Sequence, residues 1–338
     1  AGFRSLHALD IDQNVPPPLY FNPAVPGQVF DQAPRAFNVG AREKVTRPNN
    51  LEAVAFWSVT ALSSLVQSRQ VTATELTRMY LERIRRLDPL VRSVITLTEE
   101  RALEQAAKAD EEIAAGRYRG LLHGIPWGAK DLLAARGYRT TWGFKAYEDQ
   151  VIDMDATVVQ RLDNAGAILI AKLSTGEIAR GDSWLGIQTR NPWNTKEGSG
   201  GSSAGPGAAT AAGLVGFSIG TDTTGSILGP SRTCGITGLR PTFGRVSRHG
   251  VMPVCWSLDK VGPMCRSAAD CAIVFEAIYG ADGQDLAVVD KPFNYDGDAS
   301  IDDIRVGYLR SAFERDANDD NHTAIQNDLT SLDTLRNL

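Results

Sequence analysis

Small residues are concentrated in one segment of this chain, and their density restricts how that segment can fold. The 338-residue sequence holds 32 glycines, which gather between Gly198 and Gly250. Residues 198–207 are almost all Gly, Ser or Ala, and they lead directly into the alanine-rich run 208–214. A flexible linker joins independent units, whereas small residues that lead into a tightly packing helix indicate close approach of backbone to backbone or to a ligand. We therefore predict a helix over 208–214, preceded by a loop over 198–207 whose backbone lies very close to another backbone segment or to a ligand.

Hydrophobic periodicity predicts an α/β fold for the residues around this loop. Apolar residues recur at helical spacing in six further segments, 61–66, 72–84, 99–115, 157–165, 268–279 and 322–338. Short apolar or β-branched runs predict strands at 93–97, 124–130, 167–172, 216–220 and 304–309. Ser267 and Asp270 have the spacing of a capping box at the start of the helix 268–279. The alternation of strand, helix and strand is typical of α/β proteins.

The two ends of the chain differ from its middle. Residues 1–50 are rich in proline and lack helical periodicity. Because proline fixes φ and lacks an N–H donor, this composition predicts an extended arm that lies over the surface. We expect residues 51–338 to form one domain. The sequence ends inside an amphipathic helix, so we expect the C-terminal portion of that domain to be short.

Composition excludes several classes of protein. With 43% apolar and 22% charged residues, the chain has globular composition, and it contains no apolar run of 18 residues that would span a membrane. The net charge is −5 and the Lys and Arg residues are scattered, which argues against a nucleic-acid surface. The four cysteines lack the spacing of a zinc site and are predicted to be buried free thiols. We expect a cytoplasmic protein, whereas removal of an N-terminal signal would instead place it in the periplasm or outside the cell.

The strongest chemical signal is a serine in a second glycine-rich turn. The run 220–230 follows a predicted strand and presents Ser226. Successive backbone N–H groups in such a turn form an anion-binding nest, so Ser226 combines a nucleophile with an oxyanion hole, as acyl transfer requires. The candidate base is Lys130 at the end of an apolar strand, which must be desolvated to act near pH 7 and which Ser202 would hydrogen-bond. An ordinary loop serine and a lysine that extends to the surface remain open alternatives.

Other short motifs are weaker. Residues 201–205 match the G-x-S-x-G nucleophile elbow, but that elbow needs a hydrophobic strand immediately before it, and 191–200 reads as a polar loop. Ser257 and Lys260 match S-x-x-K without its companion motifs. The glycine-rich tract fits neither of the common nucleotide-binding patterns.

Taken together, the ordered motifs resemble the amidase signature family. The resemblance covers about residues 51–285 and rests on GGSSAG, GTDTTGS, CGITGLRPT, HGIPWGAKD, GAILIAK and TRNPWN, at 200–205, 220–226, 234–242, 123–131, 166–172 and 189–194. It implies a central mixed β-sheet flanked by helices on both faces (α/β/α). It also implies an amidase that uses a Ser–Ser–Lys triad and an acyl-enzyme, with no cofactor and no metal.

The resemblance assigns roles to individual residues. Ser226 matches the family's nucleophile, Ser202 the bridging serine that follows a cis peptide from Gly201, and Lys130 the base. The oxyanion hole corresponds to the backbone N–H groups of Thr223, Thr224, Gly225 and Ser226, and the supporting residues correspond to Ser203 and Asp222.

The sequence departs from the family pattern beside the nucleophile. Ala204 and Thr224 replace smaller family residues. Leu228 and Gly229 stand where most members carry an arginine, which in some of them engages a substrate carboxylate. These two positions predict a pocket wall and a substrate without a carboxylate there.

The resemblance leaves three functions open. These are a stand-alone hydrolase of a small amide, ester, anilide or carbamate, the A subunit of a tRNA-dependent amidotransferase, and a non-catalytic scaffold. Direct nucleic-acid or membrane contact is not expected, and a homodimer stays open.

Overall fold

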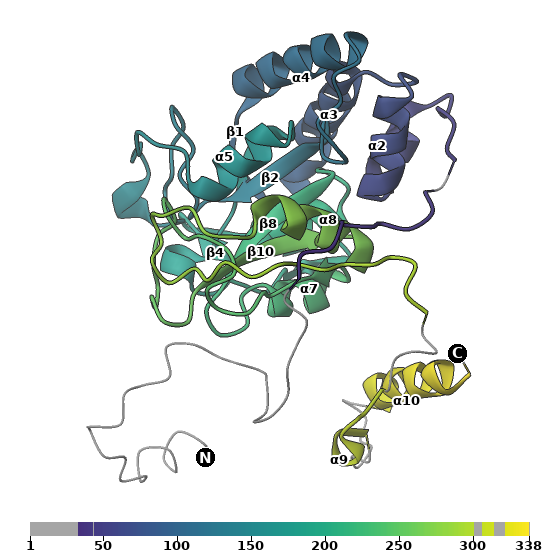
Figure 1. The fold of residues 1–338 in the computed structure, drawn as a ribbon. Helices are drawn as coiled ribbons and strands as arrows, with labels where there is room; N and C mark the ends of the chain where they lie inside the picture. Colours follow the sequence, from purple (N-terminus) through teal and green to yellow (C-terminus); the bar gives the residue numbers. More distant parts are fainter. Residues whose placement is uncertain (1–32, 43, 301–305, 314–321, 338) are drawn as a thin grey trace. The chain divides into compact units, whose positions relative to one another are not determined.

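The computed structural model describes residues 33–42, 44–300, 306–313 and 322–337 (Figure 1). The chain divides into two compact units, Ala1–Tyr295 and Asp296–Leu338, which are considered separately. The sequence placed a boundary at residue 51 and a single domain after it, whereas the contacts divide the chain after Tyr295.

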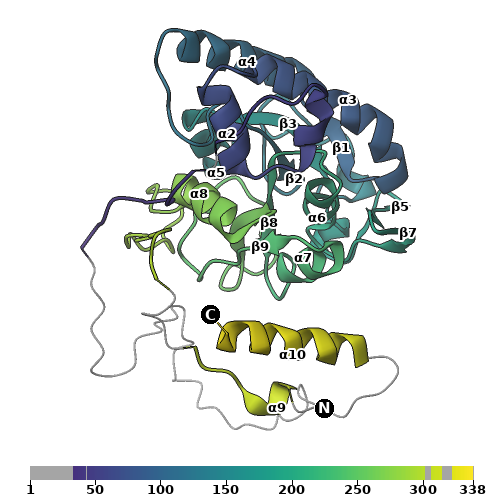
Figure 2. The ribbon, with the colours of Figure 1, turned by 90° about the vertical axis from the view of Figure 1, so that its right-hand side faces the viewer.

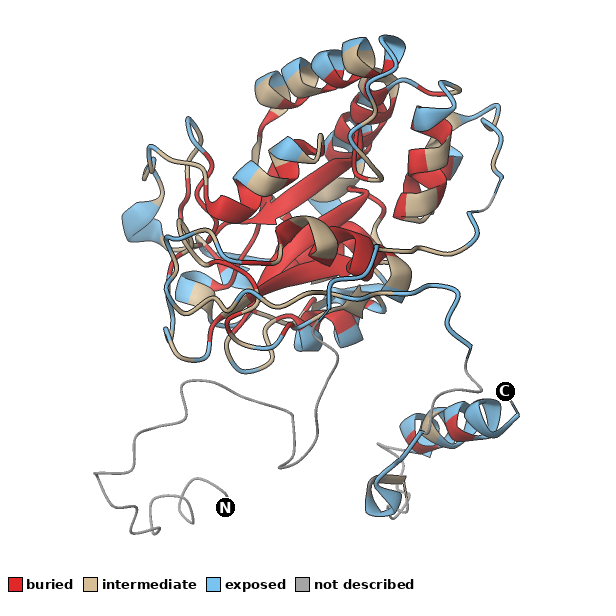
Figure 3. Cartoon of the chain, viewed as in Figure 1, coloured by how far each residue is buried: buried red, intermediate tan, exposed pale blue. Residues whose placement is uncertain are grey.

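A six-stranded mixed sheet forms the centre of the first unit (Figure 1). Its strand order is β1-β3-β2-β8-β10-β9, with bounds β1 Val94–Leu97, β2 Pro126–Lys130, β3 Ile168–Leu173, β8 Phe217–Asp222, β9 Thr237–Gly238 and β10 Lys260–Cys265. The three central strands β3, β2 and β8 run parallel, and the outer pairs are antiparallel. Every residue of these three central strands is buried, as expected for parallel strands covered on both faces. Figure 3 shows this buried layer.

Helices cover both faces of the sheet. The α-helices of this unit are α2 Val59–Gln67, α3 Ala73–Val91, α4 Glu99–Ala114, α5 Thr157–Asn164, α6 Ala204–Ala211, α7 Leu228–Cys234 and α8 Ala268–Ile278. Short 3-10 helices are η1 Leu51–Phe56, η2 Lys145–Tyr147 and η3 Glu177–Ala179. Helices α5 and α8 contact each other on one face, and α6 and α7 contact each other on the other (Figure 2). The predicted α/β/α architecture is thus confirmed.

Most predicted elements occur within a few residues of their expected bounds, and capping residues mark the start of some helices. Thr72 caps α3 and accepts from the Glu75 N–H in a complete capping box. At α8, Ser267 accepts from the Asp270 N–H, but the Asp270 carboxylate accepts from Val59 N–H at 2.8 Å instead of closing the box.

The small-residue loop is shorter than predicted. Helix α6 begins at Ala204 rather than at residue 208, so part of the expected loop is its first turn. Pro206 suits that turn because its missing N–H has no helical partner there. A Cβ at Gly205 would lie 2.3 Å from the Ser174 backbone nitrogen, so glycine permits close contact of the helix with the chain that follows β3. The polar residues before the loop also differ from expectation, because they form two-stranded ribbons, β4 Ser183–Trp184 with β5 Ile187–Gln188 and β6 Arg190–Asn191 with β7 Asn194–Gly198.

The described part of the N-terminal arm lies against a late segment of the first unit. Asn38 N–H donates to the Tyr295 carbonyl at 3.1 Å, and the Phe37 ring stacks on that of Tyr295 with centroids 5.5 Å apart. The arm is extended and anchored by aromatic contacts. Its first 32 residues lie outside the described part.

In the second unit, α9 spans Arg310–Phe313 and α10 spans His322–Arg336. The helix predicted over 322–338 is therefore present. The strand predicted over 304–309 is wrong for residues 306–309, which form neither strand nor helix before α9 begins; residues 304 and 305 lie outside the described part. No helix within the described ranges has the length and apolar character needed to cross a bilayer.

Three cysteines are buried free thiols and the fourth, Cys255, is partly exposed. The predicted free thiols are thereby confirmed, with Cys255 less buried than expected.

Candidate active site

A buried lysine lies at the carboxyl end of central strand β2. Lys130 is 0% exposed and is among the largest fully buried side chains. Strand β2 is apolar up to this residue, and its neighbours β3 and β8 are buried as well. A charged ammonium at such a place is costly unless it is hydrogen-bonded, so the partners of Lys130 determine what it can do.

Three hydroxyl groups surround the Lys130 amine. Lys130 Nζ donates to Ser202 Oγ at 2.8 Å, to Ser203 Oγ at 3.0 Å and to Thr221 Oγ1 at 2.8 Å. The Ser203 hydroxyl donates in turn to the Thr221 carbonyl at 3.0 Å. The Ser203 proton is therefore already used in a hydrogen bond. The Ser202 hydroxyl accepts from Lys130 and donates to no acceptor within the described residues. Of the two serines, Ser202 is the one able to give its proton to a neutral amine.

Burial lowers the pKa of Lys130 to about 7, and the nearby carboxylates of Asp222 and Asp259 oppose that change. Desolvation dominates because it disfavours the charged form. Near neutral pH a substantial fraction of this lysine is a free amine, which is the state that a general base needs.

The residues on either side of Ser202 are held by backbone contacts. The peptide bond between Gly201 and Ser202 is cis, as the family resemblance implied. The Ser203 N–H donates to the Ser226 carbonyl at 3.1 Å. The segment that carries Ser202 is therefore bonded directly to the turn that carries Ser226.

The turn after β8 is organised by one buried carboxylate. Asp222 is 0% exposed and accepts from the N–H groups of Gly225 and Ile227, each at 2.7 Å. The backbone N–H groups of Thr223, Thr224 and Ser226 have no hydrogen-bond partner within the described residues.

Three amides in one turn are thus left to bind an anion. Of the four amides that the resemblance assigns to an oxyanion hole, the Gly225 N–H donates to Asp222, and the other three have no partner within the described residues. The Ser226 side chain is partly exposed, so a small molecule can reach its hydroxyl.

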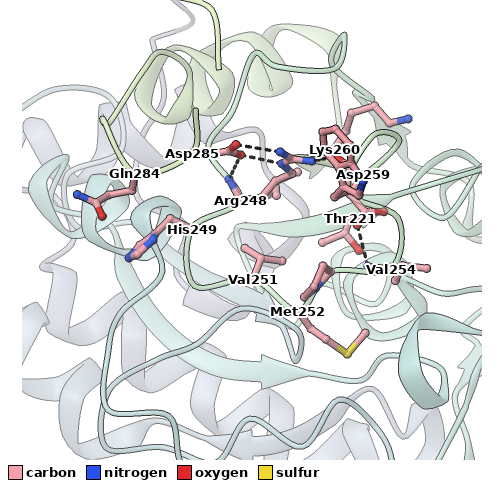
Figure 4. Close-up of a pocket in the computed structure, with 13 residues that line it drawn as sticks. Thr221, Arg248, His249, Val251, Met252, Val254, Asp259, Lys260, Gln284 and Asp285 are labelled. Atoms are coloured by element: carbon pink, nitrogen blue, oxygen red, sulfur yellow. Dashed lines mark hydrogen bonds and ion pairs between the residues drawn. The ribbon is translucent and has the colours of Figure 1, made fainter. Parts of the chain in front are cut away.

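A pocket of about 280 Å³ opens beside Thr221 of strand β8 (Figure 4), and neither Lys130, Ser202 nor the turn 223–226 is part of its lining. Thr221, which binds Lys130, is one of its lining residues, and Asp259 is another. Asp259 accepts from the Thr223 hydroxyl at 2.6 Å with one oxygen, and from the N–H groups of Val254 and Cys255 at 2.7 and 2.9 Å with the other. One carboxylate therefore ties the turn to the loop that forms the pocket wall.

Leu228 and Gly229, which were predicted to line the substrate pocket, are exposed residues at the start of helix α7. Neither they nor Ser226 line the pocket beside Thr221, so their predicted role stays a prediction. A Cβ at Gly229 would meet only the Gly201 carbonyl oxygen, at 3.5 Å, so there is room for a substituent there.

The sequence reasoning missed Thr221 and Asp259. Thr221 belongs to the GTDTTGS motif, but the motif does not indicate which of its hydroxyl groups contacts Lys130. Asp259 lies 36 residues after Thr223 and reaches it only through the antiparallel pairing of β8 with β10. No cluster of three or more His, Cys, Asp or Glu side chains suited to a metal ion occurs in the part of the chain that the structure describes.

Comparisons with known proteins agree on one family. Residues 75–337 match the family model described as Amidase. The A subunit of glutamyl-tRNA(Gln) amidotransferase from Roseiflexus sp. (strain RS-1) is 44% identical over 273 residues, which are 79% of this chain and 55% of that protein.

Solved structures show the same likeness. The native peptide amidase from Stenotrophomonas maltophilia matches with a TM-score of 0.67 and 41% identity, covering 70% of this chain and 50% of that one. An amidase family protein from Bacillus anthracis matches with a TM-score of 0.65 and 33% identity, covering 70% and 49%. The chain thus spans about half the length of the relatives it matches.

Proposed function

The chain belongs to the amidase family, and we propose that it hydrolyses a carbon–nitrogen amide bond through Lys130, Ser202 and Ser226. The observation that carries the proposal is the buried Lys130 amine, which contacts the Ser202 hydroxyl at 2.8 Å and has a pKa near neutrality. A base that is neutral at working pH and hydrogen-bonded to a serine is what nucleophilic catalysis without histidine requires.

The proposed reaction has two halves. Neutral Lys130 takes the Ser202 proton while Ser202 takes the proton of Ser226, and the Ser226 oxygen bonds to the amide carbonyl carbon. The free amides of the 223–226 turn stabilise the oxyanion. The proton then returns through Ser202 to the nitrogen, the C–N bond breaks and the amine leaves. Water attacks the acyl-enzyme by the same relay and releases the carboxylic acid.

The backbone contacts support this relay. Because Ser203 N–H donates to the Ser226 carbonyl, the hydroxyls of Ser202 and Ser226 are carried by two bonded segments. Asp222 fixes the turn by accepting two of its amides, which keeps the remaining amides oriented without any need for reorganisation during the reaction. Esters, anilides and carbamates present the same carbonyl and fall within the proposal.

Covalent labelling tests the proposal. We expect a fluorophosphonate to add one adduct to the intact protein, and the Ser226→Ala variant to remain unlabelled. Ser257→Ala is the matched control, because Ser257 is also partly exposed and belongs to the S-x-x-K match that was set aside. Ser202→Ala should slow labelling by at least about 10³-fold, since residues of a triad act as a unit. Labelling that persists in Ser226→Ala, or a folded protein that takes no adduct, would contradict the proposal and favour a non-catalytic scaffold.

A second candidate is the A subunit of an amidotransferase, because one of the matched relatives carries that name at 44% identity. Such a protein would work only with its partner subunits. Amide hydrolysis by the purified chain alone favours the hydrolase, whereas stable co-purification with partner proteins, and activity only in their presence, favours the amidotransferase component.

A further inference from the structure

The pocket beside Thr221 is lined by two basic and two acidic residues, which neutralise one another. Arg248 forms an ion pair with Asp285, Nε to Oδ2 at 2.7 Å, with both side chains largely buried. Arg248 also donates to the Trp256 carbonyl. A guanidinium paired in this way offers no free positive charge to a ligand carboxylate.

The second pair of charges consists of Asp259 and Lys260. Asp259 is occupied by the Thr223 hydroxyl and by two loop amides. Lys260 donates to the Thr223 carbonyl at 3.2 Å, and it lies near the carboxylates of Asp222 and Asp259. These four charged residues are therefore engaged with one another, with the turn or with the loop backbone, whereas His249 and Gln284 add two polar side chains that have no hydrogen-bond partner within the described residues.

Apolar residues form the largest part of the lining. They are Val251, Met252, Pro253, Val254, Trp256 and Val261. Val254 is 49% exposed and Trp256 is 60% exposed. Apolar side chains gathered at the mouth of a cavity are typical of a binding site. Figure 4 shows the labelled Val251, Met252 and Val254 beside Thr221.

The volume limits what can enter. An apolar cavity of about 150 Å³ holds a benzene molecule, and this pocket measures about 280 Å³. A phenyl ring with a short chain, or a branched alkyl group, would fill it. A large lipid or a folded polypeptide segment would not.

We propose that this pocket binds an uncharged apolar substituent, aromatic or branched aliphatic, of the amide whose carbonyl reacts at Ser226. The inference rests on the proposed function, since it takes the pocket and Ser226 to be parts of one site. It predicts weak binding of substrates whose side group carries a carboxylate, because Arg248 is already paired with Asp285 and Lys260 lies near the carboxylates of Asp222 and Asp259.

Binding to an inactive variant tests the pocket without relying on turnover. Ser226→Ala is titrated calorimetrically with acetamide, 3-phenylpropanamide, N-(2-phenylethyl)acetamide and succinamate. Each buried methylene should raise affinity about fourfold, so we expect one of the two phenyl amides to bind at least 30-fold more tightly than acetamide. Which of them does so shows whether the acyl or the amine side enters the pocket. Succinamate should bind no better than acetamide.

Two exposed residues of the same loop provide the variant and its control. Val254→Asp, made in the Ser226→Ala background, places a carboxylate in the wall and should reduce the phenyl preference to less than threefold. Leu258→Ala, at a position 44% exposed but outside the lining, should leave the preference intact. Equal affinity for acetamide and both phenyl amides, or tighter binding of succinamate, would overturn the inference.

Turnover separates the two proposals. If wild-type protein hydrolyses acetamide and the phenyl amides with the same kcat/KM, the apolar pocket is wrong and the amidase proposal stands. If the phenyl amides bind selectively but fluorophosphonate never labels Ser226, the pocket is right as a binding site and the proposed chemistry is wrong.

Discussion

Replacing Lys130 by methionine measures whether this lysine is neutral in the folded protein. Methionine has a similar length and no titratable group, so it fits the cavity while removing the amine. In the unfolded chain a lysine has a pKa of 10.5, and burial lowers it to about 7 in the folded protein. Between these two values the unfolded chain holds a proton that the folded chain lacks, so wild-type stability rises with pH. Below pH 7 both states are protonated and this contribution is constant.

The size of the effect follows from the two pKa values. Each pH unit between them changes the free energy of unfolding by about 1.4 kcal/mol, so the whole interval corresponds to roughly 5 kcal/mol. From pH 7 to pH 9 the wild type should gain about 2.3 kcal/mol that the variant does not gain, because about half of Lys130 is already neutral at pH 7. Every other titrating group, including buried Lys172, is present in both proteins and cancels in the difference.

Urea unfolding of both proteins at pH 6, 7, 8 and 9 provides the test. We expect Lys130→Met to be relatively most stable at pH 6 to 7 and to lose that advantage steadily toward pH 9, while it lacks hydrolytic activity at every pH. A stability difference that stays constant within about 1 kcal/mol from pH 7 to pH 9 would mean that Lys130 titrates near its usual value. It would then be an ammonium at neutral pH, and the general-base argument would fail.

Three further substitutions test the surroundings of the site. Asp131→Asn should destabilise the protein by about 3–5 kcal/mol in urea unfolding, because it leaves the fully buried Lys172 without the carboxylate it contacts at 2.7 Å; a loss below 1 kcal/mol would contradict this. Asp222→Asn should lower the free energy of unfolding by about 2–4 kcal/mol and slow fluorophosphonate labelling, because the side-chain amide cannot accept from both N–H groups that the carboxylate binds at 2.7 Å. Unchanged labelling would show that the turn keeps its conformation without this carboxylate. Gly201→Ala should cost at least about 3 kcal/mol, since its Cβ would lie 1.8 Å from a backbone oxygen. Gly229→Ala, with its nearest contact at 3.5 Å, is the control and should leave the melting temperature unchanged.

The sequence predicted the contact between Lys130 and Ser202 for a local reason. The residues around Lys130 form a short apolar run, and residues 198–207 leave so little side-chain volume that backbone contact is almost required. Both signals are contained in a few consecutive residues. The structure accordingly brings Lys130 together with Ser202 and Ser203.

Features that depend on pairing between distant segments were not predictable. The start of α6 at Ala204 is set by close approach to Ser174, which no propensity records. The pocket is formed by residues 248–261 only because β10 pairs with β8 and brings that loop beside the turn. Helix α7, which begins at Leu228 directly after the Ser226 turn, was likewise not predicted from the sequence.

Asp259 couples the pocket loop to the turn that follows β8. Its carboxylate holds Thr223 on one side and residues 254–255 on the other, so a change in the pocket loop reaches the turn that would stabilise the oxyanion. The same negative charge, together with that of Asp222, raises the pKa of Lys130 against the effect of burial. Burial alone would make the amine a weaker base than the reaction needs, and the two carboxylates alone would keep it protonated. A pKa near 7 is the balance of these effects, and it lies where a general base is most effective at neutral pH.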